Sequence, residues 1–318
     1  MSHIEIKKTK SNNYASFVKK VVFMGESCVI KKSMGLQSST LNKEKFLLDN
    51  IDLITKEEFD FRKKYLSQII SKISHNEKLP EKIELASIKL NNLIDAKDCQ
   101  EVVDIEFAKE FIFNSNNIEG SKIPPQAVRE IIDKGDTRYS DKNEIKEVKN
   151  SIEAFNYLKK SFKFNIQSIK KLYHVLTKDL EMQKGVSYPR GFKKVQNVVG
   201  NSITTAPENV ESELIGLLRW YRENKGKIHP LILAFEFHKR YEGIHPFLDG
   251  NGRTGRLIMN KILMGKGYQP IIVYKENKES YFNSLAKVND GMSKKYYQFM
   301  LEQTRKSYDF LESVIKKY

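Results

Sequence analysis

Residues 245–256, with the sequence HPFLDGNGRTGR, are the stretch that most strongly determines the expected fold. They lie between two apolar stretches with helical spacing, LILAFEFHKRYEGI at 231–244 and RTGRLIMNKILM at 253–264. We therefore expect a tight loop between two buried helices, with the second helix starting near Arg253. We expect the apolar side chain of Phe247 to anchor this loop in the core.

The residue types in this loop suit a chain of phosphates. Gly250 and Gly252 allow the backbone to come close to a ligand, and their amides precede a helix N-terminus, which attracts anions. Arg253 and Arg256 share one helix face, and two guanidinium groups there suit phosphate oxygens. Asp249 supplies the hard oxygen ligand that Mg²⁺ takes beside phosphates.

His245 stands at the entrance of the loop, where an imidazole with an ordinary pKa of about 6.5 suits a general base. A calcium-binding loop starting at Asp249 fits less well. Such a loop needs an oxygen ligand at its fifth position and glycine at its sixth, where this chain has Arg253 and Thr254. A purely structural turn would not need a histidine, an aspartate and two arginines together.

Length and composition exclude several classes of protein. It has 318 residues, which suggests two domains or one domain with an appendage, and 40% of them are hydrophobic, which excludes global disorder. Cys28 and Cys99 are too few for a disulfide scaffold or a multi-cysteine zinc site. No apolar run reaches the ~18 residues of a membrane helix, and the charged N-terminus is not a secretory signal. A cytoplasmic location without membrane partners is expected.

The net charge of +15 could serve to bind polyanions such as nucleic acid. It could also reflect a lysine-rich composition that has no binding role. The first 35 residues contain seven lysines against two glutamates. Within them, β-branched runs at 16–24 and 27–34 flank Gly25-Glu26 and predict a hairpin, to which 3–8 could add a third strand. A small solvated sheet is favoured here over a nucleic-acid surface.

The rest of the chain is predicted to be mostly helical. Apolar residues at three- and four-residue spacings predict helices at 43–50, 56–73, 82–93, 104–114, 124–133, 143–161, 166–181, 208–224, 230–241, 253–264, 278–290 and 293–317. A β-branched segment around Gly200-Asn201 predicts a second hairpin at 195–205.

The loop at 245–256 resembles the signature of Fic-domain proteins, His-Pro-Phe-x-Asp/Glu-Gly-Asn-Gly-Arg-x-x-Arg, and matches every defining position. The resemblance extends over residues 107–290. It implies a mostly α fold, a Fic-type helical bundle with a β-hairpin flap, here joined to the small N-terminal β-hairpin or meander. It also implies a protein adenylyltransferase that transfers AMP from ATP to a Ser, Thr or Tyr hydroxyl and releases pyrophosphate.

The same resemblance implies a role for each residue of the loop. His245 matches the histidine that deprotonates the target hydroxyl, and Asp249 matches the ligand of Mg²⁺ or Mn²⁺. Arg253 and Arg256 match the arginines that hold the β- and γ-phosphates. The other positions expected at the nucleotide are Gly250, Asn251, Gly252, Thr254 and Gly255.

Two further segments are implied to contact the nucleotide. The hairpin at 195–205 matches the flap that positions the acceptor by strand addition. It would place Val199, Gly200, Asn201 and Ser202 near the nucleotide. Tyr281, Phe282 and Asn289 match positions that contact adenine and ribose, although an ordinary amphipathic helix would show the same pattern.

Residues 115–120, SNNIEG, resemble the inhibitory motif Ser/Thr-x-x-x-Glu-Gly/Asn of Fic proteins. On a helix, Ser115 and Glu119 fall one turn apart on one face. The resemblance implies that Glu119 reaches the nucleotide site, pairs with Arg256 and holds ATP in a non-productive pose. A helix end closed by Gly120 would account for the same residues, and both interpretations can hold together.

These expectations divide the chain into four regions. They are a small basic β-hairpin or meander at 1–35, a helical connector at 36–100, a Fic domain with its inhibitory helix at 101–292, and a C-terminal helix at 293–318. ATP and an unidentified protein target are the expected partners, and a homodimer is left open. A de-AMPylating or bifunctional enzyme, transfer of UMP or phosphate, and a nucleic-acid-binding regulator are the alternatives.

Overall fold

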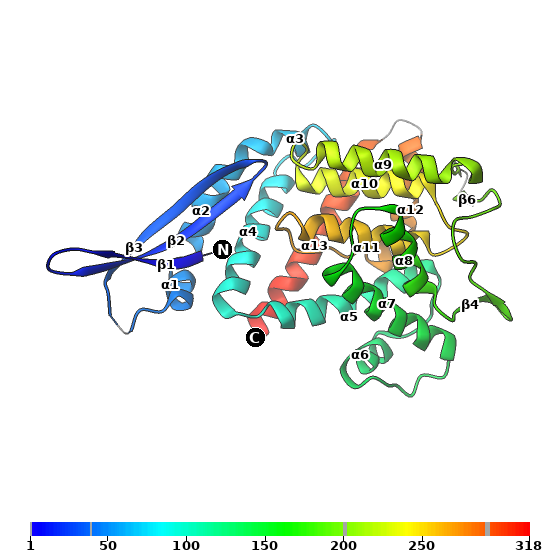
Figure 1. The fold of residues 1–318 in the computed structure, drawn as a ribbon, viewed down its shortest axis with the longest axis horizontal. Coiled ribbons are helices and arrows are strands. Elements are labelled where there is room, and N and C mark those ends of the chain that lie inside the picture. The colour runs from blue at the N-terminus through cyan, green and yellow to red at the C-terminus, as the bar shows by residue number, and fades with distance from the viewer. Residues whose placement is uncertain (1, 39, 200–201, 290–292) are drawn as a thin grey trace.

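The computed structural model describes residues 2–38, 40–199, 202–289 and 293–318. Most of the described chain is helical, with a three-stranded sheet at the N-terminus and two short hairpins, so the expected mostly α class is confirmed. Figure 1 shows the sheet at one end of the molecule, with the helices gathered beside it. Within the described residues, no helix is long and apolar enough to cross a membrane.

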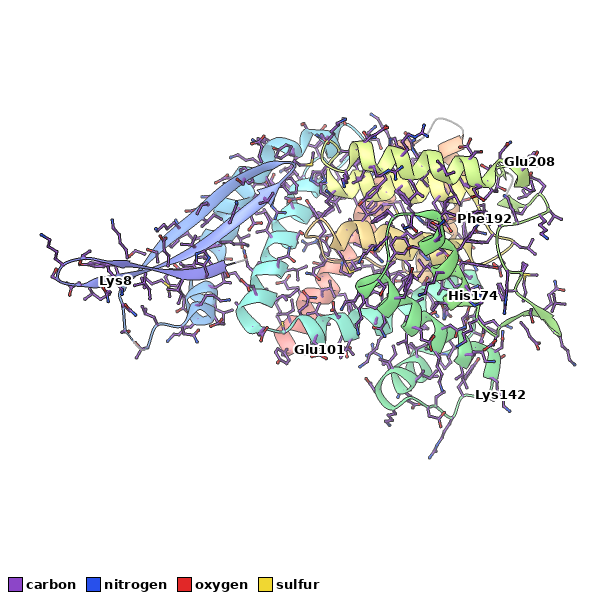
Figure 2. The ribbon with its side chains drawn as sticks, viewed as in Figure 1. Lys8, Glu101, Lys142, His174, Phe192 and Glu208 are labelled. Atoms are coloured by element: carbon purple, nitrogen blue, oxygen red, sulfur yellow. The ribbon has the colours of Figure 1, made fainter. Side chains whose placement is uncertain are left out.

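The N-terminal sheet is antiparallel and consists of β1 (Ser2–Lys8), β2 (Asn13–Phe23) and β3 (Glu26–Leu36), in that order. Met24 and Gly25 form the turn between β2 and β3, with φ angles of 53° and 84°. Positive φ at both turn residues matches the twist of a two-residue hairpin. The turn therefore lies one residue earlier than expected. Lys8 lies toward the end of the sheet that points away from the helices (Figure 2).

The sheet contacts α2 (Ile51–Arg62) through β3, and α2 packs with α1 (Lys43–Asp49) and α4 (Leu79–Lys97). A small apolar cluster joins them and consists of Phe17, Val21, Ile30, Leu47, Ile54 and Ala96. Three of the seven N-terminal lysines form ion pairs, Lys19 with Glu58, Lys31 with Glu5 and Lys32 with Glu57. Part of the positive charge of this region is therefore neutralised within the protein.

The other elements follow in chain order. The helices are α3 (Ser67–Ile70), α5 (Gln100–Glu119), α6 (Pro125–Lys134), α7 (Lys142–Lys160), α8 (Ile166–Thr177), α9 (Val210–Asn224), α10 (Pro230–Ile244), α11 (Asn251–Met264), α12 (Lys278–Asn289) and α13 (Ser293–Lys317). The short strands are β4 (Glu181–Gln183), β5 (Val186–Ser187), β6 (Val198–Val199) and β7 (Ser202–Ile203). Three 3-10 turns lie at Lys63–Tyr65, Pro207–Asn209 and Lys275–Asn277.

Several helix predictions differ from the structure in their bounds. The helix expected at 166–181 ends at Thr177, and residue 181 begins β4; the helices expected at 82–93 and 230–241 are longer, as α4 and α10. Two further differences are larger. α5 continues to Glu119 instead of ending at residue 114, because its polar side chains bond back to the helix: the amides of Asn114 and Asn117 donate to the carbonyls of Glu110 and Phe113. The helix expected at 56–73 is divided, because α2 ends at Arg62 and α3 follows a 3-10 turn.

α11 lies at the centre of the helical body. It contacts α5, α7, α8 and α10. α10 is apolar around most of its circumference and almost entirely buried, as expected of a helix inside a core. The N-terminal end of α11 therefore begins where side chains from several helices can meet.

Candidate active site

The loop between α10 and α11 reverses the chain through two left-handed residues. His245 caps α10 with φ 50°, and Gly250 precedes α11 with φ 79°. Asn251 fastens the loop, since its Oδ1 accepts from the Phe247 amide and its Nδ2 donates to the Phe247 carbonyl, both at 2.8 Å. Phe247 is fully buried and stacks on Tyr173 with ring centroids 3.8 Å apart. The local sequence thus produces a rigid, anchored turn.

His245 is largely enclosed, with 17% of its side chain exposed. Its Nδ1 lies 3.8 Å from Oε2 of Glu242, one turn earlier on α10. Burial, and then the charge of nearby Lys193, lower the pKa of His245 to about 4. Burial also raises the pKa of Glu242 to about 8, against the opposing effect of Arg256. At neutral pH the imidazole is therefore uncharged and able to accept a proton.

Arg256 is buried and held by the C-terminal end of α5. Its Nη2 lies 2.7 Å from Oε1 of Glu119 and donates to the Ser115 carbonyl at 2.9 Å, and its Nε donates to Ser115 Oγ at 3.0 Å. Gly120 ends α5 with φ 116°. The helix-capping glycine and the Glu119–Arg256 pair are thus present in the same structure.

Glu119 also covers the first turn of α11. A Cβ built on Gly252 would overlap Oε1 of Glu119 and lie 2.9 Å from Nη1 of Arg256. The carboxylate therefore rests directly against the backbone of Gly252, at the helix N-terminus where an anion binds best. With 22% of its side chain exposed, Glu119 lies at the open side of the site.

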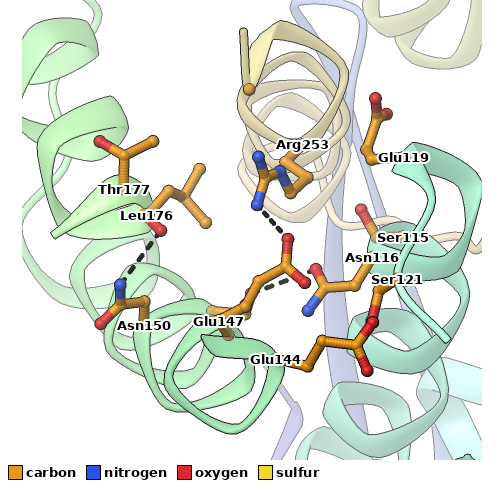
Figure 3. Close-up of polar contacts among 12 residues, drawn as sticks. Ser115, Asn116, Glu119, Ser121, Glu144, Glu147, Asn150, Leu176, Thr177 and Arg253 are labelled. Atoms are coloured by element: carbon orange, nitrogen blue, oxygen red, sulfur yellow. Dashed lines mark hydrogen bonds and ion pairs between the residues drawn. The ribbon is translucent and has the colours of Figure 1, made fainter. Parts of the chain in front are cut away.

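Arg253 and Asp249 share a second set of contacts. Arg253 pairs with Glu147 of α7 through Nη1, and its Nη2 donates to Tyr188 Oη at 3.2 Å and lies 4.0 Å from Oδ2 of Asp249. Tyr188 Oη in turn donates to Asp249 Oδ2 at 2.8 Å. Figure 3 shows Glu147 between Arg253 and the α5 residue Asn116, with Glu119 on a separate side.

A divalent cation has one suitable ligand here. The Asp249 side chain is 44% exposed, and its Oδ2 lies 4.0 Å from Nη2 of Arg253. Within the described residues, no cluster of three or more His, Cys, Asp or Glu side chains could hold a metal by itself. One carboxylate fits Mg²⁺, which commonly takes its other ligands from substrate phosphates and water.

The predicted flap is an antiparallel hairpin in which Val198 pairs with Ile203 and Val199 with Ser202. For Val199 and Ser202 the structure describes the backbone, and Gly200 and Asn201 lie outside the described residues. Lys193 joins the base of the hairpin to α10. Its Nζ donates to Asn197 Oδ1 and Thr204 Oγ1 at 2.6 Å, and to the Ile244 carbonyl at 3.3 Å.

The remaining predicted residues lie in α11 and α12. Thr254 is buried and its Oγ1 donates to the Gly250 carbonyl at 2.8 Å. Tyr281 is also buried, with its hydroxyl 2.6 Å from Nε2 of His238 and its ring 6.0 Å from the Arg256 guanidinium. Phe282 is partly buried, and its ring packs against that of Tyr281. Asn289 is the last residue of α12, and the structure describes only its backbone.

Four side chains at this site were not predicted from the sequence: Glu147, Tyr188, Lys193 and Glu242. Glu242 lies three residues before His245 on an expected helix, so the spacing could have revealed it. The other three come from segments without a recognisable local motif, and only their packing against α10, α11 and the loop between these helices brings them to the site.

Comparison with known proteins identifies the domain. Residues 163–263 match the model of the Fic/DOC family. Protein adenylyltransferase Fic from Drosophila mojavensis is 30% identical over 207 residues, which are 63% of this chain and 40% of that protein. The protein of the same name from Drosophila melanogaster is 35% identical over 119 residues, 37% of this chain and 24% of that protein. The chain thus matches less than half the length of these curated relatives.

Solved structures show the same fold. A Fic-domain-containing signalling protein from Bacteroides thetaiotaomicron superimposes with a TM-score of 0.64 at 22% identity, covering 74% of this chain and 97% of that one. A Fic family protein from Desulfovibrio desulfuricans gives 0.63 at 24% identity, covering 74% and 73%. Fic-1 from C. elegans gives 0.57 at 18% identity, covering 86% and 93%. Residues 163–263 of this chain thus match the Fic/DOC family, and the chain shares its fold with these structures of Fic proteins.

Proposed function

We propose that this protein transfers AMP from ATP to a Ser, Thr or Tyr hydroxyl of a target protein, and that Glu119 restrains the reaction. The observation that carries the proposal is the set of groups around the N-terminus of α11. A neutral histidine, a partly exposed aspartate and two arginines lie on the loop after α10 and the first turns of α11, and Arg256 adjoins the Gly252 backbone. The names of the curated relatives support the same activity.

In this proposal His245 is the general base. One nitrogen of the neutral imidazole carries a hydrogen, and the other accepts the proton of the target hydroxyl. The hydroxyl oxygen forms a bond to the α-phosphorus, and the bond from that phosphorus to the bridging oxygen breaks. Pyrophosphate leaves with the electron pair of that bond.

The rest of the site positions the triphosphate and neutralises its charge, which is the main task in phosphoryl-type transfer. Arg253 and Arg256 would bind the β- and γ-phosphates, and the first turn of α11 supplies amides and a favourable dipole. Asp249 would hold Mg²⁺ or Mn²⁺, which supplies further charge neutralisation when bound. The β6–β7 flap would align the target segment by strand addition.

Glu119 opposes this arrangement in two ways. Its carboxylate occupies the Arg256 guanidinium and lies against Gly252, so a phosphate group would have to displace it from both. Its negative charge also repels the triphosphate. Loss of the carboxylate should therefore allow ATP to bind in a productive position.

The experiment compares transfer of label from α-labelled and γ-labelled ATP with Mg²⁺ present. The proteins are wild type, Glu119→Gly, Glu119→Gln and Glu119→Gly with His245→Ala. Glu119→Gln keeps the side-chain length and the helix, so it controls for the backbone freedom that glycine adds. We expect α-label on protein in both single variants and none in the double variant.

Other results would overturn the proposal. Label from γ-labelled ATP would indicate a kinase, and no label from either nucleotide would point to removal of AMP, another nucleotide or a required partner. A separate incubation of labelled protein with wild type tests removal of AMP, the main alternative activity. We do not extend the proposal to nucleic acid, because three of the N-terminal lysines are paired within the protein.

A further inference from the structure

Each of the two arginines at the start of α11 is paired with a carboxylate from a different helix. Arg256 pairs with Glu119 of α5, and Arg253 pairs with Glu147 of α7. Both arginines are buried, and only 14% of the Glu147 side chain is exposed. The sequence motifs account for Glu119, but they leave Glu147 without a role.

The contacts of Arg253 divide between the two ends of its guanidinium. Nη1 pairs with Glu147, while Nη2 donates to Tyr188 and points toward Asp249. Because the guanidinium is planar and its donors are fixed relative to one another, a contact at one end determines the direction of the other. Glu147 therefore sets the direction of the end that faces the candidate metal ligand.

Glu147 and Glu119 differ in how easily they can leave their arginines. Glu119 is the last residue of α5, next to Gly120, at the open side of the site. Glu147 lies inside α7 on a firmly attached turn: the Asn150 amide donates to the carbonyls of Leu176 and Lys178 at 3.2 and 2.8 Å (Figure 3). These bonds hold the backbone of the turn that carries Glu147 against the end of α8.

The same turn of α7 is also attached to α5. The hydroxyl of Ser151 donates to the Glu147 carbonyl at 2.8 Å and to Asn116 Oδ1 at 3.3 Å. Burial raises the pKa of the Glu147 carboxyl, and the Arg253 charge opposes that effect. A buried charge pair of this kind loses its compensation when one partner is removed.

We propose that Glu147 is a positioning residue of the nucleotide site, which holds the Nη2 end of Arg253 toward the phosphates beyond the α-phosphate and stays in place when Glu119 withdraws. This inference rests on the proposed function, because it assumes that the arginines bind a triphosphate. It assigns the two carboxylates opposite effects: Glu119 competes with the nucleotide, and Glu147 supports its binding.

Equilibrium binding of ATP, ADP and AMP with Mg²⁺ tests the inference without requiring catalysis. The parent is the Glu119→Gly protein, so that Glu119 does not mask the site. Glu147→Gln is added to this parent, and Glu153→Gln is the matched control, because Glu153 is an exposed residue on the same helix. We expect Glu147→Gln to weaken ATP and ADP binding about tenfold, as for one misplaced charge-assisted hydrogen bond. AMP binding, and all binding by the control, should stay unchanged.

Each other outcome contradicts a defined part of the argument. Tighter ATP binding by Glu147→Gln would show that Glu147 competes for Arg253, and equal weakening for AMP would show a general structural role. If Glu147→Gln does not fold, Glu147→Asp keeps the charge but shortens the reach, and it should still weaken ATP more than AMP. Failure of the parent to bind any of the three nucleotides would instead overturn the proposed function.

Discussion

Gly255 of α11 packs directly against Glu242 of α10. A Cβ built on Gly255 would lie 2.6 Å from Glu242 Oε1, 2.9 Å from Tyr241 Cδ1 and 3.0 Å from His238 Nδ1. The two central helices therefore reach their observed separation because residue 255 has no side chain. This contact also places the buried carboxyl group of Glu242 between α10 and the first turns of α11.

Gly255→Ala should destabilise the protein. Overpacking in a filled core costs about 1–3 kcal/mol, which exceeds the ~0.5–1 kcal/mol that alanine gains over glycine inside a helix. Gly216→Ala is the matched control, since Gly216 lies inside α9 with no atom within 4 Å of its Cβ position. Urea unfolding should show a lower free energy of unfolding for Gly255→Ala and a higher one for Gly216→Ala. A gain of stability in both would contradict the tight contact.

Glu242→Gln should stabilise the protein, and more so at higher pH. Burial raises the pKa of Glu242 to about 8 from an ordinary value of 4.5, so the folded state binds its proton more tightly than the unfolded state. The free energy of unfolding of the wild type therefore falls as pH rises between these values, and glutamine removes that dependence. Thermal unfolding at pH 5 and pH 8 should show a benefit mainly at pH 8. An equal benefit at both values would exclude titration of Glu242 as its cause.

The loop at 245–256 could be predicted because its signals are local. Its glycines, its flanking apolar helices and its charged residues lie within a few turns of one another, and the structure places α11 within two residues of the expected start. The N-terminal sheet could also be predicted from the sequence, because alternating β-branched runs around a glycine turn indicate a hairpin.

The partners of the loop could not be predicted in the same way. Glu147 reaches Arg253 only because α7 packs against α11, and the sequence separation of more than one hundred residues leaves no local pattern. The extension of α5 to Glu119 was also not predicted, for a different reason. Polar residues that favour a loop in isolation, such as Asn114 and Asn117, instead bond to their own helix within a buried environment.

Lys193→Met should impair transfer to a protein target more than it affects ATP binding. Lys193 joins Asn197 and Thr204 at the base of the flap to the Ile244 carbonyl beside His245, and burial lowers its pKa to about 8. Methionine would remove the donor that links these three acceptors and loosen the flap. Lys194→Met is the control, because Lys194 is the exposed neighbour. Transfer rates and ATP affinity, both measured in the Glu119→Gly background, should separate the two effects. Equal loss in both variants would argue against a specific role of Lys193.

The dependence of AMP transfer on pH should reveal the enclosed state of His245. Burial and the charge of Lys193 lower its pKa to about 4, so the imidazole stays deprotonated, and active as a base, well below an ordinary histidine pKa of 6.5. The rate of the Glu119→Gly protein should therefore stay constant down to about pH 5, where an ordinary histidine would already be mostly protonated.

Removing the Lys193 charge raises the pKa of His245, so Lys193→Met should move the acid limb of the profile to higher pH, and Lys194→Met should not. An acid limb near 6.5 in all three proteins would show that His245 is solvated in the active enzyme or is not the base.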